Sequence, residues 1–153
     1  MSFENMVGRE YPTVVWEVQR CKIREMALAL GDDNPIYHDT KVAEANGYKD
    51  LPPHPILSRV GNHFGNMEKP IIRDLQALEM PTMAVHAEER YEYLRDYYAG
   101  DVLTGIPKIA DMTQKVNKSG GKMRITQIET MWRNQNGEDV LKVNSTLIEK
   151  LAP

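Results

Sequence analysis

The chain has 153 residues, of which 41% are hydrophobic and 27% charged, with a formal net charge of -3 and a pI of about 5.8. This length and composition predict one folded domain over residues 1–153 and argue against disorder. A mildly acidic chain lacks the basic surface that nucleic acid requires, and no apolar run reaches the length of a membrane span. Because the N-terminus has no signal-like pattern, we expect a cytoplasmic protein.

The first half of the chain has helical texture. Residues 13–18 are β-branched and apolar, which predicts a short strand. Residues 19–30 carry apolar side chains at helical spacing, and we expect this helix to end at Gly31. After the polar loop 32–38, Asp39 or Thr40 begins a short helix that ends at Asn46-Gly47.

A further helix is expected to begin at Pro55, since proline suits the first helical position. Gly61 lies on its apolar face, and we expect the helix to end at Pro70. The other members of this face are Leu57, Val60, Phe64 and Met67. The glycine predicts close packing of this helix against a sheet.

The sequence pattern of the second half of the chain predicts long strands joined by short turns. Apolar residues alternate from Met83 to Tyr93, and a second stripe keeps one parity through Val102, Ile106, Ala110, Met112 and Val116. A change of phase predicts a bulge near Thr126-Gln127, and Asn136-Gly137 predicts a hairpin before the last strand. Together these elements predict an α+β domain, a long antiparallel sheet wrapped around one central helix. Its open edges favour pairing with a second copy.

Metal sites are not expected from this sequence. The single cysteine, Cys21, excludes both a disulfide framework and a cysteine zinc site. The four histidines, His38, His54, His63 and His86, form no His-Glu-x-x-His pattern and no pair at helical spacing.

Two stretches resemble a known family. The loop Gly31–Asp39 is similar to the Gly-Asp-x-Asn-Pro-x-His-x-Asp loop of the MaoC-like R-specific enoyl-thioester hydratases and dehydratases. Residues 86–103 resemble that family's second-strand signature, and the likeness is greatest to its N-terminal or partner-subunit branch. The resemblance implies a hotdog fold and reversible addition of water to an acyl thioester. It implies no cofactor other than the carrier of the substrate, coenzyme A or acyl carrier protein.

Carried over residue by residue, the resemblance implies a catalytic pair, Asp32 and His38, although His38 lies one position late. Tyr37 occupies the position of the family histidine, and a tyrosine is a poor base at neutral pH. Where catalytic relatives have His-Gly and use the glycine N–H, this chain has His54-Pro55, and proline has no N–H to donate. The residues expected to bind substrate are Asn34, Tyr37, His54 and Gly61.

Each of these residues also has a structural interpretation. Asp32 is a common turn residue, Tyr37 is equally suited to packing, and the two histidines suit loop positions. Three functions therefore stay open. The first is the acyl-binding half of a hydratase or dehydratase, a hydro-lyase, paired with a catalytic hotdog subunit. The second is a self-sufficient homodimer that uses Asp32 and His38. The third is a non-enzymatic acyl-thioester binding module, and a thioesterase is a weaker fourth.

Overall fold

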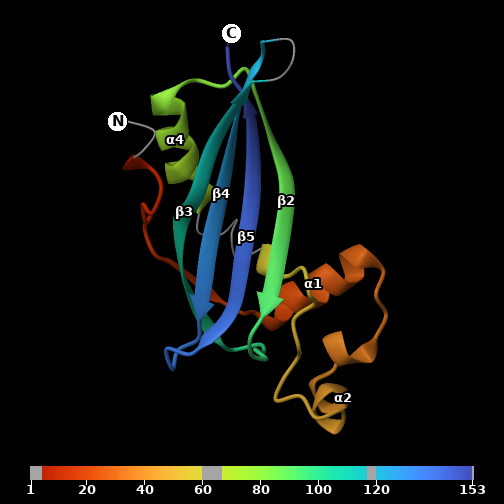
Figure 1. Cartoon of the computed structure of the whole chain (residues 1–153). Helices are drawn as coiled ribbons and strands as arrows, with labels where there is room; N and C mark the ends of the chain where they lie inside the picture. The colour runs from red at the N-terminus through yellow and green to blue at the C-terminus, as the bar shows by residue number, and fades with distance from the viewer. Residues whose placement is uncertain (1–4, 60–66, 117–119, 153) are drawn as a thin grey trace.

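The computed structural model describes residues 5–59, 67–116 and 120–152, and its largest element is a curved five-stranded sheet (Figure 1). The strand order is β1-β3-β4-β5-β2, and every neighbouring pair is antiparallel. The strands are β1 (Val14–Glu17), β2 (Met83–Tyr93), β3 (Val102–Val116), β4 (Lys122–Arg133) and β5 (Asp139–Lys150). The prediction of an α+β domain with a long antiparallel sheet is confirmed.

Short helices occupy the first half of the chain; the two longer ones were predicted, while a three-residue helix lies in the expected polar loop 32–38. They are α1 (Arg20–Leu30), the 3-10 helix η2 (Pro35–Tyr37) and α2 (Thr40–Ala45). Helix α1 ends because Gly31 adopts a left-handed conformation, with φ of 69°. Asp39 caps α2 by accepting a hydrogen bond from the backbone N–H of Lys41 at 2.8 Å. In Figure 1 α1 lies to the right of the lower part of β2, and α2 lies below it.

Helix α4 (Glu68–Leu78) was not predicted, and the expectation that a helix ends at Pro70 is wrong. Pro70 lies in the first turn of α4, where a backbone N–H has no partner within the helix and its loss costs nothing. Before this helix, Ser58 and Arg59 are helical and Pro55 lies in the preceding turn. The predicted packing positions Val60, Gly61 and Phe64 lie outside the described residues.

Two buried clusters join these elements. In the larger one Trp132 is fully buried and lies so close to Gly105 that a Cβ there would stand 2.8 Å from the indole ring. Trp16 packs edge-on against it, with ring centroids 6.0 Å apart, and Ile23 brings α1 into the same cluster. The smaller cluster fixes α4 to the sheet and consists of Met6, Tyr11, Ile71, Leu75, Ile109 and Met112.

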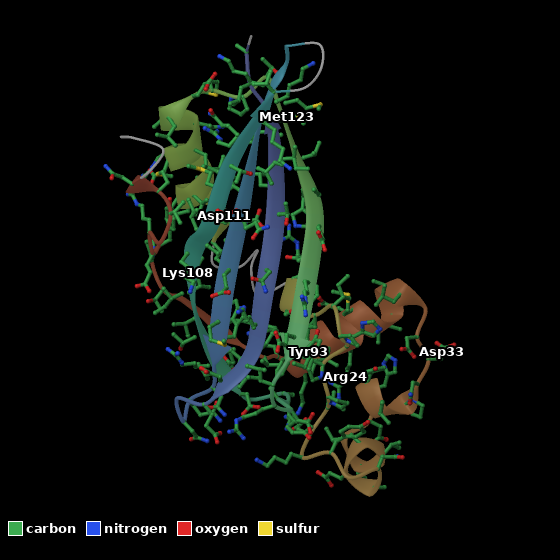
Figure 2. All side chains as sticks on the ribbon, in the orientation of Figure 1. Arg24, Asp33, Tyr93, Lys108, Asp111 and Met123 are labelled. Carbon is green, nitrogen blue, oxygen red and sulfur yellow. The ribbon has the colours of Figure 1, made fainter. Side chains whose placement is uncertain are left out.

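The predicted stripe on β3 is wrong at both ends, since Val102, Ile106 and Val116 are exposed, the last of them to 69%. Val102 and Ile106 are each 37% exposed, because a bulge between Ile109 and Asp111 reverses the phase of the strand. Before the bulge the odd-numbered Ile109 points inward, and after it the even-numbered Met112 does. Figure 2 shows Asp111 on the same side of β3 as Lys108, the side turned to the viewer.

The bulge expected near Thr126-Gln127 does not lie on β4, which pairs there with β5 without a break; the extra residue, Ala110, belongs to β3 and lies opposite Gln127 and Ile128. The apparent change of phase arose because Arg124, and not an apolar residue, points into the core and is 1% exposed. Its Nε donates to Glu149 Oε2 at 2.6 Å, and its Nη2 donates to the carbonyl of Glu79 at 3.2 Å. A cation at the C-terminal end of α4 is also favoured by the helix dipole.

Breaking this buried pair should therefore be costly. Glu149→Gln leaves the Arg124 charge buried without a counter-charge, and we expect the free energy of unfolding to fall by about 3 kcal/mol in urea denaturation. Asp139→Asn is the matched control, because its partner Arg133 is half exposed and such pairs contribute at most about 1 kcal/mol. Equal losses from both changes would contradict this interpretation.

Candidate functional site

The loop after α1 is shaped by two side chains that bond to their own backbone. Asp32 Oδ1 accepts a hydrogen bond from the N–H of Asn34 at 3.0 Å. Asn34 Oδ1 in turn accepts from the N–H of Ile36 at 3.2 Å, and Pro35 starts η2. These turns account for the Asp-x-Asn-Pro sequence, because each residue fixes the backbone of the next. Asn34 was predicted to bind substrate, but its side-chain oxygen accepts the hydrogen bond from Ile36.

Asp32 and His54 meet across the site, although 22 positions separate them in the sequence. His54 Nε2 lies 3.9 Å from Asp32 Oδ2, and the two side chains are 23% and 33% exposed. The His54 ring also lies against Tyr37, with centroids 5.7 Å apart. Three predicted site residues therefore converge at one place, which is open to solvent on one side.

His38 does not face the carboxylate of Asp32. Its Nε2 lies 3.1 Å from the backbone carbonyl oxygen of Asp32, and Arg24 Nε donates to the His38 carbonyl at 3.0 Å. A carbonyl oxygen only accepts, so this contact requires the proton on Nε2. The imidazole of His38 thus closes the loop onto itself. Its catalytic role stays a prediction.

Tyr37 is a hydrogen-bond donor in this setting. Burial raises the pKa of its phenol, and the neighbouring Asp32 and Tyr48 raise it further. The phenol is therefore protonated at neutral pH, and it can donate to an acyl carbonyl but cannot remove a proton from water.

The segment that carries His54 is held by β2. The Tyr93 hydroxyl donates to the carbonyl of Pro55, and Figure 2 shows Tyr93 at the lower end of β2. Farther along the strand, Glu89 accepts from Arg59 Nη1 at 3.3 Å and from the Tyr91 hydroxyl at 2.6 Å. The sequence predicted a tyrosine stripe on β2 but not the contacts of Tyr93 with Pro55 and of Glu89 with Arg59, because a local pattern does not indicate a partner 30 or more positions away.

A cavity of about 170 Å³ lies beside Pro55. Its wall is mainly aromatic and proline side chains, and Arg95 and Asp96 are its charged members. The remaining lining residues are Tyr48, Pro52, Pro53, Tyr93, Tyr97 and Tyr98. This cavity provides apolar surface next to the polar convergence of Asp32, Tyr37 and His54.

Gly61, also predicted to bind substrate, lies outside the described residues. Within residues 5–59, 67–116 and 120–152, no group of three or more His, Cys, Asp or Glu side chains is placed to hold a metal ion. Over the same ranges, no helix is both long and apolar enough to cross a membrane.

A family model described as "FAS1-like, dehydratase domain region" matches residues 5–143. The chain belongs to this family. A UPF0336 protein of Streptomyces coelicolor is 34% identical over 152 residues, which cover 97% of this chain and 95% of the relative. A UPF0336 protein of Leifsonia xyli is 35% identical over 142 residues, with coverage of 92% and 91%.

Solved structures with 21% identity share the fold of this FAS1-like dehydratase-region protein. The HadBC (3R-hydroxyacyl-ACP dehydratase) complex of Mycobacterium tuberculosis gives a TM-score of 0.71, over 94% of this chain and 96% of that chain. The ChsH1-ChsH2 complex of the same organism gives 0.75, over 94% and 86%. A MaoC-like dehydratase gives 0.78 over 99% of this chain and 44% of that chain. The predicted MaoC-like hotdog fold is confirmed.

The loop geometry makes a local prediction. Asn34→Ala removes the acceptor of the Ile36 N–H and should cost about 1 kcal/mol, as the loss of a helix cap does. We expect faster hydrogen–deuterium exchange at residues 35–38 and weaker contact between Tyr37 and His54. Asp33→Ala is the control, because Asp33 is exposed at the outer edge of the loop (Figure 2). Unchanged exchange in Asn34→Ala would contradict this account of the loop.

Proposed function

We propose that this protein is a subunit of an acyl-thioester hydratase or dehydratase, and that it binds the acyl group and works with a second hotdog subunit. The carrier of the acyl group is coenzyme A or acyl carrier protein. Membership of a dehydratase-like hotdog family supports the reaction class. The observation that carries the proposal is Pro55, which replaces an N–H donor at the thioester position.

Addition of water to an enoyl thioester needs a base and a donor for the enolate oxygen. Pro55 has no N–H, so this position cannot supply the donor that the glycine N–H would provide. Tyr37 is a protonated phenol and not a base. A chain with this site is suited to holding an acyl thioester, with part of the catalytic machinery supplied by a partner.

The second subunit would pair along β2. This strand lies at one edge of the sheet and pairs only with β5 among the described strands. Apolar side chains on it are exposed, 56% for Met83 and 42% for Val85. An open, apolar edge strand favours association with another chain. The HadBC and ChsH1-ChsH2 structures, which share this fold, are both complexes.

A self-sufficient homodimeric hydratase is the second candidate. It is favoured by the approach of Asp32 to an imidazole, that of His54, within 3.9 Å. A non-enzymatic acyl-thioester binding module is the third. It would be indicated if the chain bound an acyl thioester but supported no hydration with any hotdog subunit.

Oligomeric state gives a first test. Because burial of β2 removes an exposed edge, we expect native mass spectrometry at low micromolar concentration to show a dimer or a larger assembly. Replacement of Val85 by lysine, a charge on this edge strand, should shift the assembly toward monomer. A clean monomer of the unaltered chain would contradict a shared site.

The isolated chain should hydrate a short enoyl-CoA only weakly. Loss of one oxyanion donor costs about a hundredfold to a thousandfold in other enzymes. Co-expression with a hotdog subunit that carries an intact Asp-x-Asn-Pro-x-His loop should raise the rate in a spectrophotometric hydratase assay. Turnover by the chain alone at rates typical of enzymes would instead support the homodimeric hydratase.

A further inference from the structure

We infer that Asp32 and His54, rather than Asp32 and His38, form the pair that holds the reacting water at this site. The inference rests on the proposed function, since it concerns the same acyl-thioester site. It goes beyond that function by assigning to Asp32 the role of base and to His54 the hydrogen bond that orients the water.

The carboxylate of Asp32 is held in one orientation by the loop. Its Oδ1 is occupied by the N–H of Asn34 at 3.0 Å, within the turn that shapes the loop. This bond fixes the plane of the carboxylate and leaves Oδ2 directed at His54. Oδ1 therefore stabilises the turn, whereas Oδ2 can contact a water or a substrate.

The distance between His54 Nε2 and Asp32 Oδ2 leaves room for one water molecule. At 3.9 Å, His54 Nε2 and Asp32 Oδ2 are too far apart for a direct hydrogen bond. A single water oxygen can lie about 2.8 Å from each of them, which is an ordinary hydrogen-bond length. Both side chains are partly exposed, so water and a small acyl group can reach this point.

His38 is not placed to share the water with Asp32 Oδ2. Its Nε2 is committed to the backbone carbonyl of Asp32, and its own carbonyl accepts from Arg24. These contacts join α1, the loop and η2, which is a structural use. A group that orients the reacting water must reach it by a hydrogen bond, and His54 Nε2 meets this condition beside Asp32 Oδ2.

The transfer of the proton and the addition of water balance with Asp32 and His54, and the N–H donor lost at Pro55 is left to the partner subunit. Asp32 Oδ2 takes a proton from the water, while His54 Nε2–H donates to the same oxygen and orients it. The oxygen bonds to the β carbon, and the electron pair of the double bond moves toward the thioester as an enolate. The α carbon then takes the proton back from Asp32, so that one water has been added. Tyr37 lies beside His54 and can donate to the thioester oxygen.

The position of His54 is itself secured by the fold. Pro53 and Pro55 restrict the backbone on either side of it, and Tyr93 holds the carbonyl of Pro55. The buried Nδ1 of His54 makes no hydrogen bond with the described residues, so the ring is exposed to ligand only at its Nε2 side.

The test uses the intact chain and observes the imidazole nitrogens of His38 and His54 by long-range ¹H–¹⁵N NMR. Asp32→Asn keeps the backbone carbonyl and removes the carboxylate charge. We expect the ring signals of His54 to move and those of His38 to stay. Crotonyl-CoA, the probe, should then perturb His54 and not His38 in the unaltered chain.

The slow hydration of crotonyl-CoA, followed in the same samples, gives the second readout. We expect His54→Gln to lower this rate by about a hundredfold or more, while the matched control Asp33→Ala, at an exposed position of the same loop, keeps most of it. The inference is overturned if Asp32→Asn moves His38 alone, or if bound crotonyl-CoA leaves His54 unperturbed. If crotonyl-CoA neither binds nor reacts, the proposed function fails, and the Asp32→Asn spectra alone decide whether the pair exists.

Discussion

Trp132 is the side chain on which the arrangement of the site depends. It lies fully buried on Gly105, where no side chain larger than hydrogen fits, and it contacts Trp16 edge-on. The same cluster reaches Ile23 of α1 and Leu57 beyond the proline-rich connector. The sheet thereby fixes both segments that supply polar groups. Asp32 follows α1 and His54 precedes Leu57, and their approach is a consequence of packing on one buried surface.

The candidate site is thus assembled at one end of a long sheet by short, restricted segments. Two side chains fold the loop onto itself, and prolines restrict the connector. Strand β2 connects this end to the open edge of the sheet, because Tyr93 belongs to the edge strand and bonds to the connector. We therefore expect a partner that covers β2 to contact the strand that positions His54.

Local patterns were sufficient to predict much of the fold. The end of α1 at Gly31 and the cap of α2 at Asp39 depend on the backbone conformation of single residues, which sequence indicates directly. The missed features depend on distant partners. Pro70 is tolerated because it falls in the first turn of α4, and Arg124 points inward because Glu149 on β5 neutralises it. The resemblance named Asp32 and His54 separately, but only packing brings them within 3.9 Å.

We expect an acyl thioester to lie between the loop after α1 and the connector before Leu57. A crystal structure of the protein with bound 3-hydroxybutyryl-CoA tests this most directly. The account predicts the thioester beside Tyr37, with the 3-hydroxyl group within hydrogen-bond reach of both Asp32 Oδ2 and His54 Nε2. An acyl group bound on the outer face of the sheet, or one whose hydroxyl contacts His38 instead of His54, would contradict it.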